Sequence, residues 1–84
     1  MDKLIRARAE LYGHLYKRFM AEDGPWCGQE ELEGLYETNR YLPRAMLCAR
    51  DMGHVKFNRF GGVRLTGSGV LFAEKEYFGE GDGN

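Results

Sequence analysis

Apolar and polar positions in the first quarter of the chain follow the period of an α-helix. From residue 2 to about residue 22, apolar residues recur every three or four positions and form two neighbouring rows. The rows consist of Leu4, Leu11, Leu15 and Phe19, and of Ile5, Tyr12, Tyr16 and Met20. Gly24 and Pro25 predict the end of this helix, because glycine adopts the left-handed C-terminal conformation and proline cannot continue a helix. So wide an apolar arc predicts either that the rest of the domain wraps the helix or that its outer edge meets a second copy of the chain.

A second, shorter helix is predicted from residue 28 to about residue 36. Acidic residues in its first turn are stabilised by the positive end of the helix dipole. Its buried stripe is expected to be Leu32, Leu35 and Tyr36. Residues 37–39, Glu-Thr-Asn, then supply a turn of helix-capping residues.

A third helix is predicted from about residue 40 to Met52, ending at Gly53. Pro43 must lie in its first turn, where a missing backbone N–H is harmless. Its inner face is small, so we expect a close approach to the neighbouring element; the face consists of Leu42, Ala45, Met46, Ala49 and Met52. The outer face carries Arg40, Arg44, Leu47, Cys48 and Asp51.

After the third helix the pattern changes to the alternation that is typical of β-strands. Residues 54–58 and 63–66 alternate, and Gly61-Gly62 between them predicts a hairpin. A two-residue loop would place Asn58 opposite Leu65 and mix the two faces of the hairpin. We therefore predict a three-residue loop, Phe60-Gly61-Gly62, which separates an apolar face from a polar one.

The predicted register pairs Phe57 with Leu65 and Asn58 with Arg64. It leaves Phe60 at the tip of the hairpin, where it could approach DNA, contact a partner protein or fold back on the domain. We expect it to fold back.

A final helix is predicted after residues 66–69, Thr-Gly-Ser-Gly. Its apolar side is expected to include Val70, Leu71 and Ala73, with Tyr77 or Phe78. Residues 79–84 alternate glycine with polar residues, so we interpret them as a disordered tail behind a single domain of residues 1–78.

Composition narrows the class of protein. At 84 residues the chain has room for one core, and 43% hydrophobic with 13% aromatic residues excludes an intrinsically disordered chain. Its apolar runs are too short for a membrane span, and no apolar signal region follows the first residues. We therefore expect a cytoplasmic protein.

Charge is strongly segregated along the chain, although the net charge is only −1. Residues 1–18 have a balance of +3, and residues 19–37 contain six acids and no base. Residues 38–72 contain six bases against Asp51 alone, and residues 73–84 return to −3. A basic block between acidic ones predicts a localised anion-binding face.

The order of these elements resembles the winged helix-turn-helix superfamily of DNA-binding regulators. The resemblance is at the level of the superfamily and covers roughly residues 28–75. It rests on Glu31-Leu32 and Leu35-Tyr36, on Ala45, Ala49 and Met52 before Gly53-His54-Val55, and on residues 63–69, Val-Arg-Leu-Thr-Gly-Ser-Gly. It implies an α+β, mostly helical fold of three helices, a two-stranded wing hairpin and a C-terminal helix. The helix-turn-helix would be residues 28–53 and the wing residues 54–66.

The resemblance further implies that helix 40–52 enters the major groove of double-stranded DNA and that the wing lies on the backbone. Arg40 and Arg44 could reach phosphate or a guanine edge. The remaining predicted contacts are phosphate contacts of the wing and its flank, by Arg50, Lys56, Arg59 and Arg64. Leu47, Cys48 and Asp51 on the same outer face disagree with a typical DNA reader.

The leading hypothesis is a small DNA-binding protein, a transcriptional regulator that forms a homodimer through helix 2–22. The alternative is a protein-interaction module without direct DNA contact, in which Leu47, Cys48 and Phe60 are exposed anchors.

Catalytic, cofactor and metal sites are not expected from the sequence. Gly67-Ser68-Gly69 lacks the lysine of a phosphate-binding loop, and neither Ser68 nor either cysteine has a histidine at the spacing of a nucleophile motif. Structural roles are expected for the four residues that could ligate zinc, since no pair has ligand spacing: Cys27, Cys48, His14 and His54.

Overall fold

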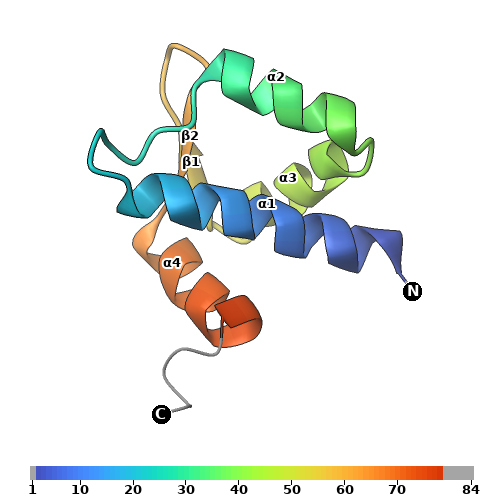
Figure 1. The fold of residues 1–84 in the computed structure, drawn as a ribbon. Helices are drawn as coiled ribbons and strands as arrows, with labels where there is room; N and C mark the ends of the chain where they lie inside the picture. The colour runs from blue at the N-terminus through green and yellow to red at the C-terminus, as the bar shows by residue number, and fades with distance from the viewer. Residues whose placement is uncertain (1, 79–84) are drawn as a thin grey trace.

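The first helix, α1 (Lys3–Met20), lies across the middle of the molecule and the other elements pack around it (Figure 1). The structure, a computed structural model, describes residues 2–78. Asp2 caps α1 by accepting a hydrogen bond from the backbone N–H of Leu4 at 2.8 Å. α1 ends at Met20, close to the predicted end, but Gly24 is not the residue that ends it: Ala21 already has an extended backbone (φ −72°, ψ 148°), and Gly24, with a φ of +116°, lies in the turn that follows.

Two further helices, α2 (Gln29–Thr38) and α3 (Leu42–Asp51), are joined by a three-residue turn. The Asn39 carboxamide oxygen accepts a hydrogen bond from the N–H of Tyr41 at 2.9 Å and so fixes this turn. Pro43 lies in the first turn of α3, as predicted. Both helices therefore begin and end close to the positions that the sequence indicates.

The inner face of α3 packs against α1 through buried Leu42, Ala45, Met46 and Ala49. Met52 was predicted on this face, but it is 45% exposed. The prediction is wrong because α3 ends at Asp51 and the chain turns away at Gly53, whose φ is +74°.

The hairpin consists of β1 (Val55–Phe57) and β2 (Val63–Leu65), paired antiparallel. Val55 pairs with Leu65 and Phe57 with Val63, so the predicted register is wrong by two residues. The side chain of Asn58 is the cause: its Oδ1 accepts hydrogen bonds from the N–H groups of residues 60 and 62, at 2.8 and 2.9 Å. The loop therefore has the predicted three residues but comprises 59–61. Because the shift is an even number, each side chain keeps its predicted face.

The segment between α1 and α2 adds a third extended stretch to the hairpin. Cys27 donates its N–H to the carbonyl of Val63 at 2.8 Å and accepts the N–H of Val63 at 2.9 Å. β2 therefore lies between β1 and Cys27, and the link before α2 is held in place by backbone hydrogen bonds.

The last helix, α4 (Gly67–Ala73), continues into a π-helical turn over Glu74–Phe78. Thr66 caps α4 by accepting a hydrogen bond from the N–H of Gly69 at 3.1 Å. Leu71 was predicted on the apolar side but is 69% exposed, because the buried stripe of α4 runs through Gly69 and Ala73 on the other side. The predicted tail, residues 79–84, lies outside the described residues.

An aromatic cluster joins α1, the start of the hairpin and α4. The phenol oxygen of Tyr12 and Nδ1 of buried His54 share a hydrogen bond of 2.6 Å, and the ring of Phe72 lies 4.5 Å from that of His54. Burial, aided by the charge of Arg8, lowers the pKa of His54, and burial raises the pKa of Tyr12 to about 12. Both groups are therefore neutral near pH 7, so the hydrogen bond between them joins two uncharged side chains.

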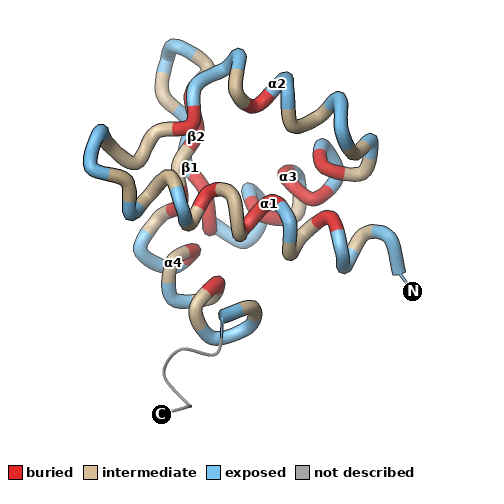
Figure 2. The backbone as a smooth tube through the Cα atoms, in the orientation of Figure 1, coloured by how far each residue is buried: buried red, intermediate tan, exposed pale blue. Residues whose placement is uncertain are grey.

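Buried positions gather where α1, α3 and the hairpin meet (Figure 2). The predicted fold class, α+β and mostly helical, is confirmed at this level for residues 2–78. No helix in the described part of the chain is long and apolar enough to cross a membrane.

Candidate nucleic-acid interface

The outer face of α3 carries a different chemistry from its buried face. Arg44, Leu47 and Asp51 are exposed, and Leu47 keeps 52% of its surface accessible. Cys48 is half-buried. The predicted outward face is therefore confirmed for Arg44, Leu47 and Asp51, whereas Arg40 is exposed but lies in the turn before α3.

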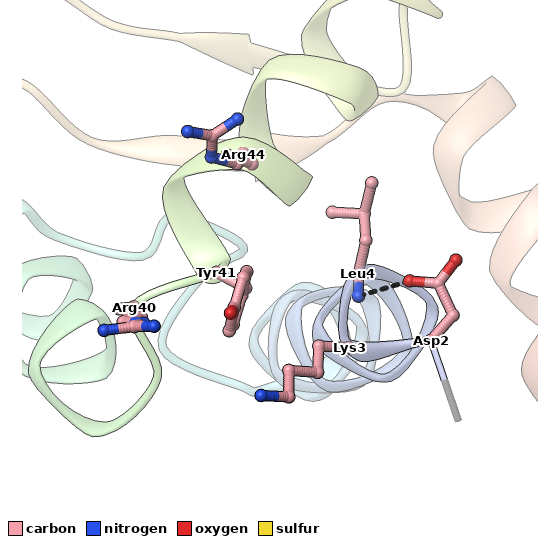
Figure 3. A pocket seen from close by; sticks show the side chains of 6 residues that line it. All are labelled: Asp2, Lys3, Leu4, Arg40, Tyr41 and Arg44. Carbon is pink, nitrogen blue, oxygen red and sulfur yellow. Dashed lines mark hydrogen bonds between the residues drawn. The ribbon is translucent and has the colours of Figure 1, made fainter.

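A basic pocket lies where the beginning of α3 meets the beginning of α1. It is an open depression of about 550 Å³. Figure 3 shows the ring of Tyr41 between the side chains of Arg40 and Lys3, with Arg44 one turn further along α3. The residues that line the pocket are Asp2, Lys3, Leu4, Arg40, Tyr41 and Arg44.

The cations of the basic pocket converge on the phenol of Tyr41. The Arg40 guanidinium lies 5.4 Å from the ring centroid, and the Lys3 ammonium lies 5.8 Å from it. A hydrogen bond from Arg40, with the charges of Lys3 and Arg40, lowers the pKa of Tyr41. The pocket is lined by three cations, Lys3, Arg40 and Arg44, against the single carboxylate of Asp2, so it has a positive surplus that favours an anion.

Sequence reasoning missed Lys3 as a member of this site. Lys3 precedes Arg40 by a long stretch of chain, and no spacing rule connects them. The signal that could have found it is the +3 balance of residues 1–18. Arg6 extends the same surplus along α1 into an adjoining pocket, which it lines with Lys3 and Tyr41.

The polar face of the hairpin holds two like charges opposite each other. Lys56 on β1 pairs in register with Arg64 on β2. Like charges at directly opposed positions destabilise a hairpin unless an anion neutralises them. Arg64 is also positioned by its guanidinium, which lies over the ring of Trp26 at 5.4 Å from the centroid.

The hairpin tip projects a cation and an aromatic ring together. Phe60 is 74% exposed, so the expectation that it folds back on the domain is wrong. The Asn58 hydrogen bonds fix a tight loop that holds Phe60 at the tip of the hairpin, and the Arg59 guanidinium lies 5.2 Å from its ring centroid.

Arg50 lies in the last turn of α3, where the negative end of the helix dipole stabilises a positive charge. Its position is thus explained without a ligand. None of the six predicted contact residues forms an ion pair with an acid among residues 2–78: Arg40, Arg44, Arg50, Lys56, Arg59 and Arg64.

Comparison with protein-family models, curated proteins and solved structures finds no match for this chain. Its function is therefore inferred from the arrangement of these side chains.

Proposed function

We propose that the protein is a small DNA-binding protein of the winged helix-turn-helix type that acts as a transcriptional regulator. The observation that carries the proposal is the set of six cations that form no ion pair within residues 2–78, distributed over the turn before α3, the outer side of α3 and the hairpin. The order of three helices, a hairpin and a closing helix is compatible with this type of fold.

In this proposal α3 enters the major groove. Its ten residues measure about 15 Å along the axis, and the groove is about 12 Å wide. Arg44 is in the N-terminal half of α3, the part of a recognition helix that reaches base edges. Leu47 follows one turn later and would pack on thymine methyl groups, while Asp51 lies at the far end of the helix.

The basic pocket and the hairpin would hold the DNA backbone on either side of that contact. Lys3 and Arg40 would share a phosphate beside Tyr41. On the hairpin, a phosphate between Lys56 and Arg64 would remove their mutual repulsion. These contacts position the protein and carry no sequence information.

A homodimer through α1 belongs to the same proposal. Two copies would read a palindromic site, and the outer edge of α1 exposes Ile5 (53%) and Met20 (64%), which a second copy could cover.

The salt dependence of binding to a random-sequence duplex tests this function. Contact with about three to five phosphates per monomer predicts a log–log slope of about −3 to −4 between affinity and salt concentration. Lys75→Ala, which removes an exposed charge outside the proposed interface, is the control and should leave the slope unchanged. A slope near zero, or no measurable binding at low salt, would contradict the proposal.

A protein-interaction module is the second candidate, and the exposure of two large apolar side chains favours it. Leu47 is 52% exposed and Phe60 is 74% exposed. With the half-buried Cys48 they would anchor a partner protein, as exposed apolar groups do at interfaces. Binding of that kind would be nearly insensitive to salt, and it would be lost in Leu47→Ser while Arg44→Ala leaves it intact.

A further inference from the structure

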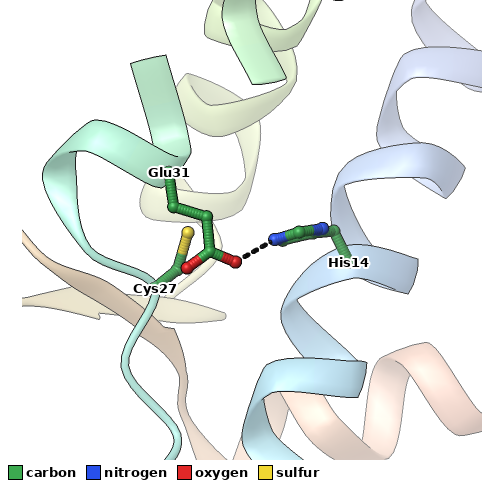
Figure 4. Close-up of side chains that lie close together, drawn as sticks. All are labelled: His14, Cys27 and Glu31. Atoms are coloured by element: carbon green, nitrogen blue, oxygen red, sulfur yellow. Dashed lines mark hydrogen bonds and ion pairs between the residues drawn. The ribbon is translucent and has the colours of Figure 1, made fainter. Parts of the chain in front are cut away.

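Three side chains from three segments of the chain converge beside α1. His14 comes from α1, Cys27 from the link that pairs with β2, and Glu31 from the first turn of α2 (Figure 4). Nε2 of His14 lies 2.6 Å from Oε2 of Glu31, and the three potential ligand atoms all lie within 4.8 Å of one another.

The donor set matches the preferences of zinc and its neighbours among the divalent transition metals. Imidazole nitrogen, thiolate sulfur and carboxylate oxygen are its ordinary protein ligands, at about 2.0–2.3 Å. Tetrahedral bonds of that length separate ligand atoms by roughly 3.4–3.6 Å. The three atoms thus need to move by only about 1 Å, with a metal ion replacing the proton that His14 and Glu31 share.

Two of the three ligand residues give access to this cluster from solvent. Cys27 is fully buried, and its thiol makes a long contact of 3.8 Å with the carbonyl of Gly28. The side chains of His14 and Glu31 are 29% and 35% exposed, which provides a path from solvent.

The nearby cation Arg18 does not block the centre. Its guanidinium donates hydrogen bonds to the carbonyl of Trp26 at 3.0 and 3.3 Å, and it lies 3.7 Å from Oε1 of Glu31. Oε2, the oxygen that faces His14, is therefore the one left for a metal ion.

We propose that His14, Cys27 and Glu31 form a binding site for a divalent transition-metal ion of the Zn²⁺ class. Three protein ligands leave a fourth position for water or an added ligand. The ion would join α1, the β2-bound link and α2 at one point, and this proposal does not depend on the proposed DNA binding. Sequence spacing could not find the site, because positions 14, 27 and 31 match no local zinc motif and Glu31 also satisfies the helix dipole.

Cobalt titration of the reduced full-length chain tests the site directly, since Co²⁺ occupies zinc sites and reports its ligands in the absorption spectrum. One equivalent should give a thiolate-to-cobalt charge-transfer band and the visible bands of a tetrahedral ion, and Zn²⁺ should displace both. Cys27→Ser should abolish the charge-transfer band. The matched control, Cys48→Ser, removes the other thiol and should retain it.

Because Cys27 is buried, the Cys27→Ser protein could fail to fold, and a second variant therefore tests the site independently. Glu31→Gln keeps the shape of a partly exposed side chain, and it should weaken Zn²⁺ binding by at least roughly tenfold, a loss typical of damaged zinc sites, with an unchanged circular dichroism spectrum. Absence of a charge-transfer band in the unmodified chain, its loss in Cys48→Ser, or full Zn²⁺ affinity in folded Glu31→Gln would each overturn the proposal. In that case His14 and Glu31 form an ordinary ion pair.

Discussion

The two sides of α3 differ in what the fold requires of them. On the inner side Leu42, Ala45 and Ala49 are fully buried against the core, and two alanines allow α3 to lie close to α1. On the outer side Arg44 and Leu47 are exposed, and no contact within the described residues accounts for their identity. One short helix thus separates residues that stabilise the domain from residues that are free to bind a partner.

The largest difference in the free energy of unfolding is expected when a leucine is replaced by alanine on the inner side of α3 and, separately, on its outer side. Leu42→Ala should lower the free energy of unfolding by about 2–5 kcal/mol, because it opens a cavity at a fully buried position. Leu47→Ala should change it by less than about 0.5 kcal/mol, since that side chain is half exposed. Urea titration of both variants measures the difference, and equal losses would show that the outer side also carries stability.

A second pair of variants extends the comparison to α4. Gly69→Ala should lower the free energy of unfolding by about 1–3 kcal/mol, because an added Cβ would collide with the backbone carbonyl oxygen of His54. Gly67→Ala is the matched control: it lies in the same turn with no atom near the added Cβ, so it should be close to neutral. Thermal unfolding of the two proteins checks this, and similar midpoints would mean that the contact between α4 and the hairpin is looser than described.

On the outer side, Arg44→Ala should separate binding from stability. If Arg44 reaches a base edge, affinity for the preferred duplex should fall roughly tenfold, while the free energy of unfolding changes by less than about 0.5 kcal/mol. Fluorescence anisotropy and urea titration on one preparation give both values. Unchanged affinity would remove Arg44 from the interface.

Lys56→Ala should have a smaller effect of a different kind. A lost phosphate contact weakens binding to all sequences about equally and makes the salt slope shallower by about 1. The variant also removes the repulsion between Lys56 and Arg64, so its stability should be equal to or slightly above that of the unmodified chain. A sequence-dependent loss of affinity would instead place Lys56 near a base.

The smallest effect on stability is expected from the titration of His54. This buried residue follows the end of α3 and donates its N–H to the carbonyl of Ala49 at 2.9 Å. Because the folded state lowers the pKa of His54, the unfolded chain binds its proton more readily. Stability from neutral His54 is therefore present above the ordinary histidine pKa of about 6.5 and is lost as pH falls below it. Unfolding free energies of the unmodified chain and His54→Gln, compared between pH 7.5 and 5.5, should differ in slope; parallel curves would contradict the prediction.

Local rules account for most of the fold. Pro43 and Gly53 place the limits of α3 correctly, because each acts on the backbone without reference to distant residues, whereas Gly24 lies beyond the end of α1. The hairpin register was missed because the Asn58 side chain, and not the glycine pair, fixes the loop. Met52 and Leu71 were misplaced because an apolar stripe does not indicate where the core stops.

The candidate sites could be predicted only in part, because they depend on contacts between distant segments. The six cations were visible as a charge block, but their neighbours Lys3 and Trp26 come from the other half of the chain. The same reason hid the meeting of His14 with Glu31, since only the folded chain brings the first turn of α2 beside α1.

An amide-resolved NMR titration with a random-sequence duplex at low salt tests DNA binding most directly. The proposed interface predicts shifts concentrated in residues 40–51 and 56–64, with a further response at Lys3 in the basic pocket. Amides of the inner side, such as those of Ala45 and Ala49, should follow only as neighbours. No shifts in these two segments at saturating duplex would contradict the proposal, and a protein partner at Leu47, Cys48 and Phe60 would then be sought.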